Sequence, residues 1–154
     1  MSLFLAFLIG FLAGLRSLTP PAAVAWAAHL GWLKLQGSLA LIGSVYAVAL
    51  VTLLALGELA ADKWPKLPNR TSVPGLVARL LTGGLAGACV AAGAGESAWL
   101  GAALGAAGGI AGAFGGYHAR KRLAQALGVP DFIVAVLEDL IAVGGCVWIV
   151  SRFA

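Results

Sequence analysis

Two adjacent acidic residues, Glu138 and Asp139, interrupt an apolar run near the carboxyl end of the sequence. They lie about seven or eight residues into a predicted helix over 132–151, a depth of roughly 10 to 12 Å at about 1.5 Å per residue. Ionisable side chains at such a depth in a membrane are costly, and they are usually paired or functional. Two neighbouring carboxylates do not both ionise there without partners. Glu138 or Asp139 is therefore expected to take up a proton or a cation.

A polar break over 16–21 separates two apolar runs near the amino terminus. Ser17 or Thr19 is predicted to cap the helix that follows, whose first turn tolerates the two prolines. A capped N-terminus offers N–H donors and a partial positive charge, and Arg16 adds a full charge and a bidentate guanidinium. Arg16, Ser17 and Thr19 are therefore expected to hold a carboxylate or a phosphate. The alternative is that Arg16 only marks the cytoplasmic end of a helix.

A second group of charges contains Glu58 and Asp62, which are four residues apart and so share one face of a helix. Their expected partners are Arg16, Arg70 and Arg79. If both acids are paired, the cluster is a structural latch; if one is not, it is a site for a proton or a cation. Both interpretations stay open at this point.

Other familiar chemistry has no support in the sequence. There is no phosphate-binding loop, dinucleotide fingerprint, zinc-protease or serine-hydrolase motif. Cys89 and Cys146 lie inside apolar runs and are expected to be packing residues. His29 and His118 are predicted near opposite membrane faces, which argues against a shared metal. We expect no cofactor, no metal and no enzymatic activity.

The elements that must position these residues are membrane helices. Of the 154 residues, 61% are hydrophobic and only 10% are charged, and the mean hydropathy is +0.98. This composition predicts an all-α, polytopic transmembrane bundle in a single domain, 1–154. Breakers and charges delimit six segments: 3–15, 20–33, 38–62, 75–95, 98–117 and 132–151. The last four reach the length of about 20 residues that a crossing requires.

The first two segments are individually short, so they form either tilted spans or a re-entrant hairpin. In a hairpin, Arg16 would reach the depth of Glu138 and Asp139 and could meet them. The first segment lacks the basic start and the cleavage site of a signal peptide, so we expect a retained helix.

Basic residues set the expected orientation. The basic connections 63–79 and 120–122 belong in the cytoplasm, which places both termini outside. This also explains the net charge of +4 without a nucleic-acid partner. Three segments before 63–79 and three after it run in opposite directions, as in an inverted repeat.

Glycines recur at four-residue spacing, which lets helix backbones approach closely in lipid. The rows are Gly10 and Gly14; Gly83 and Gly87; Gly101, Gly105 and Gly109; and Gly108, Gly112 and Gly116. The helix over 98–117 carries two rows and is expected to be the central packing helix. Its second row predicts a homodimer.

Ordered motifs connect the sequence with a known family. The residues are Gly14-Leu15-Arg16-Ser17, Thr19-Pro20-Pro21, Glu58, Asp62-Lys63, Pro65, Pro68 and Arg70-Thr71. Over nearly the whole chain, they resemble a family of small bacterial integral membrane proteins, domain of unknown function 4126. The resemblance implies a bacterial inner-membrane location and no particular activity.

The sequence thus favours a small transporter or channel-like protein for an ion or a small anionic solute, coupled to a proton or a cation. The alternative is a structural or interaction protein in the bilayer whose charges form an internal latch. A lipid-modifying enzyme is less favoured, because its metal would need carboxylates that converge at one depth.

Overall fold

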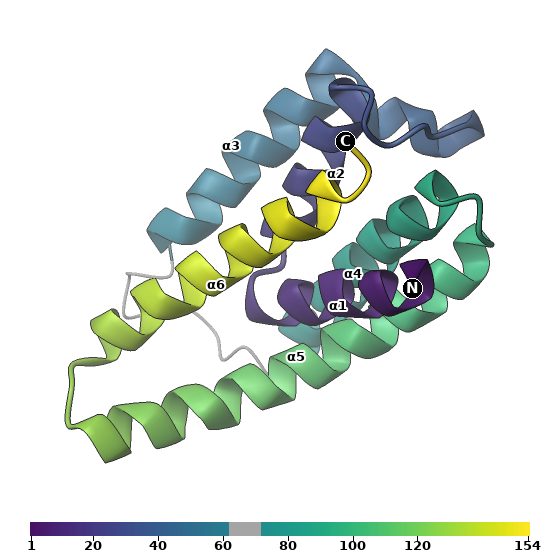
Figure 1. The fold of residues 1–154 in the computed structure, drawn as a ribbon. Helices are drawn as coiled ribbons and strands as arrows, with labels where there is room; N and C mark the ends of the chain where they lie inside the picture. Colours follow the sequence, from purple (N-terminus) through teal and green to yellow (C-terminus); the bar gives the residue numbers. More distant parts are fainter. Residues whose placement is uncertain (62–71) are drawn as a thin grey trace.

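A computed structural model of the chain describes residues 1–61 and 72–154 (Figure 1). All regular structure in these two ranges is helical, in seven segments and without a β-strand. The segments are α1 (Ser2–Leu15), α2 (Thr19–His29), the 3-10 helix η1 (Gly37–Gly43), α3 (Val45–Ala61), α4 (Val73–Gly93), α5 (Ala98–Leu127) and α6 (Asp131–Ser151). The predicted all-α class is confirmed.

Three helices, α4, α5 and α6, are each long and apolar enough to cross a bilayer, counting only the described residues. The prediction of a single spanning helix over 38–62 is wrong, because η1 and α3 meet at 63°. Ser44, at the bend, has an extended backbone, and its hydroxyl accepts a hydrogen bond from the amide of Ala47 at 3.2 Å. This cap starts α3 in a new direction. The bent pair is apolar enough to cross as one span.

Left-handed glycines set two helix ends that differ from the predicted ones. α2 ends at His29 rather than at 33, because Gly31 follows with φ of 80°. α5 continues past the predicted end at Tyr117 to Leu127, and Gly128 then stops it with φ of 60°. Glycine adopts these angles without a steric penalty. The basic residues 120–122 therefore lie on a helix, and their prediction as a connection is wrong.

The tightest unit consists of α1, α4 and α5, whose backbones meet at the glycine rows. A Cβ atom at Gly83 of α4 would lie 2.7 Å from the carbonyl oxygen of Gly105 in α5. One at Gly14 of α1 would lie 2.5 Å from the carbonyl oxygen of Gly109. α5 turns one glycine row toward α4 and the other toward α1, so it is the central packing helix of this unit. A homodimer stays a prediction, and its interface would lie outside these two rows.

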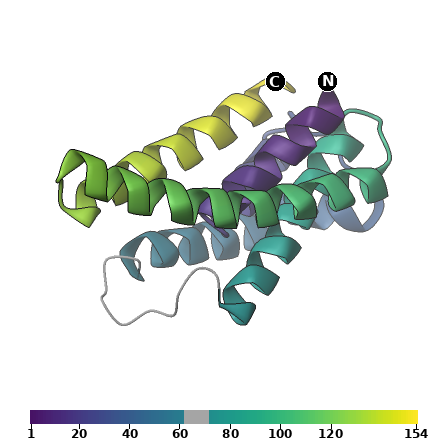
Figure 2. The ribbon, with the colours of Figure 1, turned by 90° about the horizontal axis from the view of Figure 1, so that it is seen from below.

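The remaining helices surround this unit unevenly. α2 packs against α3, η1, α4 and α6, whereas α3 contacts the other described elements mainly through α2. α5 and α6 meet at the turn over 128–130 and then diverge, so that α6 packs against α1 and α2 (Figures 1 and 2). This arrangement brings the turn after α1 between α3 and α6. The inverted repeat and the side that faces the cytoplasm stay predictions.

Candidate functional site

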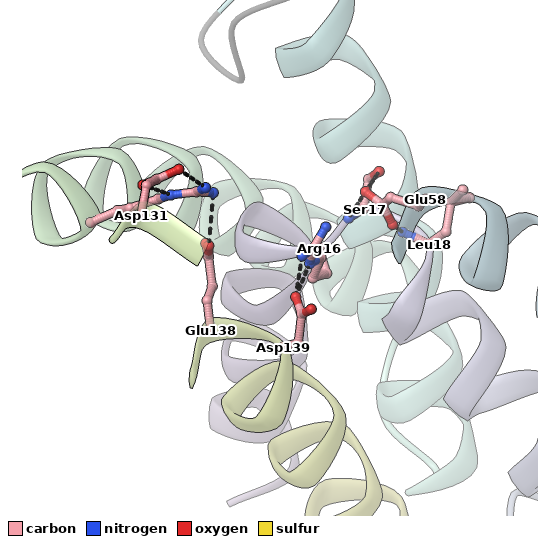
Figure 3. Close-up of polar contacts among 8 residues, drawn as sticks. Arg16, Ser17, Leu18, Glu58, Asp131, Glu138 and Asp139 are labelled. Atoms are coloured by element: carbon pink, nitrogen blue, oxygen red, sulfur yellow. Dashed lines mark hydrogen bonds and ion pairs between the residues drawn. The ribbon is translucent and has the colours of Figure 1, made fainter. Parts of the chain in front are cut away.

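Arg16 lies at the break between α1 and α2, and its guanidinium points at Asp139 of α6 (Figure 3). Its Nε donates a hydrogen bond to Oδ1 of Asp139 at 2.5 Å, and its Nη2 forms an ion pair with the same oxygen. The Arg16 side chain is 2% exposed and that of Asp139 is 21% exposed. Two residues named from the sequence thus meet, and the carboxylate is the partner that solvent reaches more easily.

Glu58 of α3 closes the other side of the same break (Figure 3). Its Oε1 accepts hydrogen bonds from the amide of Ser17 at 2.9 Å and from the Ser17 hydroxyl at 2.6 Å, and its Oε2 accepts one from the amide of Leu18 at 2.9 Å. None of these three donors is an arginine. Glu58 therefore acts as a cap for α2, supplied by a different helix.

The predicted capping by Ser17 or Thr19 is wrong. The residue at the cap position is Leu18, and no side chain of the turn itself caps the helix. The physical reason is the proximity of α3, because a carboxylate satisfies two amides at once and also complements the positive end of the helix dipole. Ser17 participates as a donor instead, and Thr19 is buried in the first turn.

Arg79 of α4 stabilises the opposite helix end at this break. Its Nε donates to the carbonyl oxygen of Gly14 at 2.9 Å, and its Nη1 donates to that of Gly75 at 3.3 Å. The side chain is buried and lies at the carboxyl end of α1, where a cation complements the helix dipole. The break is thus enclosed by charges on three sides, from α3, α4 and α6.

A second charged group joins the ends of α5 and α6. Arg120 forms a bidentate pair with Asp131, with Nε donating at 2.7 Å and Nη2 donating to the other carboxylate oxygen. Its Nη1 lies 3.6 Å from Oε2 of Glu138. Figure 3 shows Glu138 and Asp139 leaving α6 toward different partners. Sequence reasoning missed this group, because it placed Arg120 in a connection and did not name Asp131.

A cavity of about 300 Å³ reaches Glu138 between α1, α5 and α6. Most of its wall is apolar, and Arg120 lies beside Glu138 in it. Asp139 is not among the lining residues, so the two adjacent acids have different surroundings. Across the described part of the chain, no three histidine, cysteine or acidic side chains gather as metal ligands would.

Two predicted site residues, Asp62 and Arg70, lie outside the described residues. Among the others, the fold gathers Arg16, Ser17, Glu58, Arg79 and Asp139 around one break. Both positions expected to attract an anion, the Arg16 guanidinium and the N-terminus of α2, hold carboxylates of the protein itself. The site is therefore chemically suited to exchange one carboxylate for another anion, or to hold three helices together.

Comparison with known proteins supports the family and adds no activity. The model of the family described as a domain of unknown function (DUF4126) matches residues 3–151. The chain belongs to this family. Neither the curated proteins nor the solved structures contain a match. Membership and the apolar helices together fit a membrane protein of this family.

Proposed function

We propose that the protein is a small membrane carrier or channel-like protein for a small anion, coupled to a proton. The supporting observation is the pair of Arg16 and Asp139 at the break between two half-length helices. Broken helices whose N-termini and charged groups meet inside the protein are a common basis of substrate sites in transporters. The location proposed with it is the bacterial inner membrane.

The step that we propose is an exchange of partners at Arg16. A proton that binds Asp139 removes the negative charge that holds the guanidinium, and a small anion then takes its place. The greater exposure of Asp139, 21% against 2% for Arg16, supports proton entry at the carboxylate. The N-terminus of α2 provides a second position for the anion when Glu58 withdraws.

A structural latch is the second candidate, and a specific observation supports it. The carboxylates of Glu58, Glu138 and Asp139 all contact donors of other helices. Apart from Arg120 and Glu138, the side chains that line the cavity are apolar, which is unlike a hydrated pathway. In this interpretation the charges only fix α3, α4 and α6 around the break, and nothing passes through the protein.

Flux in proteoliposomes separates the two candidates. The purified full chain is reconstituted, and the uptake of acetate, chloride and inorganic phosphate is measured with and without an inward proton gradient. We expect gradient-dependent uptake of at least one anion by the wild type, loss of the gradient dependence in Asp139→Asn and loss of uptake in Arg16→Ala. Asp131→Asn, which removes an exposed acid of the same helix, should transport like the wild type.

Stability measurements complete this test. Removing one partner of a buried ion pair costs up to about 3 to 5 kcal/mol, whereas replacing both by apolar residues is often nearly neutral. The double variant Arg16→Met with Asp139→Leu should therefore unfold at nearly the wild-type temperature while its uptake stays abolished. If vesicles with the wild-type protein take up acetate, chloride and phosphate no faster than empty vesicles, the transport proposal is contradicted and the structural latch is favoured.

A further inference from the structure

The divergence of α5 and α6 leaves a groove that opens beside Glu138, with a volume of about 300 Å³. Its walls include Phe11 of α1, Leu123 of α5, and Leu137 and Ile141 of α6. The last three are about half exposed, so the groove is open at the surface. Small-molecule sites begin at about this volume and are mostly apolar with a few placed polar groups.

Glycines give this groove its depth. Gly115 and Gly116 of α5 form part of its wall and place no side chain in it. A Cβ atom at Gly115 would lie 3.7 Å from the ring of Phe11, which is an ordinary contact. A larger side chain at Gly115 therefore fits the backbone and fills the groove.

The charged end of the groove is basic. Arg120 lines it, and the exposed Lys121 and Arg122 follow on the same helix. These three cations exceed the two acids that contact Arg120, which are Asp131 and Glu138. A basic group at the end of an apolar groove between membrane helices complements an anionic lipid headgroup above its acyl chain.

We propose that this groove binds one acyl chain of an anionic phospholipid, with the lipid phosphate at Arg120, on the rim of the groove. The acyl chain replaces water or loose lipid against the exposed apolar walls. The pair of Arg120 with Asp131 orients the guanidinium at the rim. Lys121 and Arg122 leave α5 on other faces and attract anionic headgroups to this end of the helix at longer range. This site is separate from the Arg16 break and does not depend on transport.

Native mass spectrometry of the full chain tests the proposal. The protein is released from nanodiscs that contain equal amounts of phosphatidylglycerol and phosphatidylcholine with identical acyl chains. We expect the wild type to retain one phosphatidylglycerol in preference to phosphatidylcholine. Gly115→Leu should lose the retained lipid, whereas Gly144→Leu, at a helical glycine with open space around it, should retain it.

Charge variants test the headgroup. Arg120→Gln should reduce the preference for phosphatidylglycerol about fivefold, since one basic residue near an anionic surface contributes about 1 kcal/mol. Arg152→Gln, at the other end of α6 beside Trp148, should leave the preference unchanged. Equal preference in the wild type and Arg120→Gln, or lipid retention by Gly115→Leu, overturns the proposal.

A second measurement on the wild type guards against a folding defect in Gly115→Leu. Phosphatidylglycerol with a photoreactive acyl chain should label Leu123, Leu137 or Ile141 more than Leu81 and Leu85, which are exposed on α4. Uniform labelling of both groups contradicts the site. The lipid site is also contradicted if the wild type forms a dimer without bound lipid and Gly115→Leu abolishes that dimer. In that case a second copy of the chain occupies the groove.

Discussion

Glu58 satisfies two backbone amides and one hydroxyl of a turn that belongs to other helices. Hydrogen bonds to a charged group contribute about 1.5–3 kcal/mol, more than those between neutral groups. The amides of Ser17 and Leu18 have no carbonyl of their own helix to donate to, because they precede its first full turn. Their protection from solvent exchange thus depends on one carboxylate.

Glu58→Gln tests this dependence at the level of single amides. The substitution keeps the size of the side chain but removes the charge and one acceptor oxygen. We expect hydrogen exchange at Ser17 and Leu18 to accelerate roughly 10- to 100-fold, as the loss of a charged hydrogen bond implies. Exchange measured by mass spectrometry checks this. Glu96→Gln, an exposed acid that accepts from the Ser2 hydroxyl at 3.3 Å, is the control; equal protection in Glu58→Gln contradicts the capping role.

The identity of the charged residues could be predicted from the sequence, but most of their pairing could not. Charges within apolar segments are conspicuous, so Arg16, Glu58 and Asp139 are found by inspection. Their contacts depend on how helices pack, since Ser17 and Glu58 are 41 residues apart and Arg16 and Asp139 are 123 apart. Local rules therefore assigned the cap to Ser17 or Thr19, whereas tertiary packing supplies it from Glu58.

At the scale of helices, glycine has two distinct roles in this chain. In the rows of α1, α4 and α5 it permits backbone contact, and spacing alone predicts that role well. At Gly31 and Gly128 it ends a helix with a left-handed backbone. The sequence does not predict the second role at Gly128, because the charges at 120–122 indicate an earlier end of the helix. The charged residues 120–122 follow the apolar part of α5 without ending the helix.

Gly83→Ala measures the first role. The new Cβ atom would lie 2.7 Å from the carbonyl oxygen of Gly105, and backbone cannot move aside as a flexible side chain does. We expect a loss of about 1–3 kcal/mol of unfolding free energy, which is typical of overpacking. Gly144→Ala adds the same methyl group to α6 where nothing lies within 4 Å, and it should be neutral or slightly stabilising. Denaturation in detergent compares the two; equal midpoints contradict close packing at Gly83.

At the scale of the molecule, the membrane class follows from composition, but the path through the membrane does not. Within residues 1–61 and 72–154, three helices are long enough to cross alone, and the bend of 63° between η1 and α3 leaves a fourth crossing to a bent pair. The mean hydropathy of a sequence window does not detect such a bend, because Ser44 interrupts the helix but not the apolar run. Orientation rests on the basic residues and is open to direct measurement.

Cysteine labelling tests the predicted orientation. The two native cysteines, Cys89 and Cys146, are buried, so they give little background. Ser97→Cys, in the turn between α4 and α5, should react with an impermeant maleimide in intact bacterial cells, because that turn is predicted outside. Gln125→Cys, near the basic end of α5, should react only after permeabilisation. The reverse pattern would invert the topology and move both termini to the cytoplasm.

The ion pair between the first break and the last helix also bears on the order of synthesis. Because 123 residues separate Arg16 from Asp139, the ribosome completes α3, α4 and α5 before the acidic partner emerges. During that interval Arg16 lacks its contact with Asp139. The incompletely folded chain is then a substrate for quality-control proteases. Nascent chains that stop within α5 should therefore be cleared rapidly, whereas completion of α6 gives the first helices their final partner.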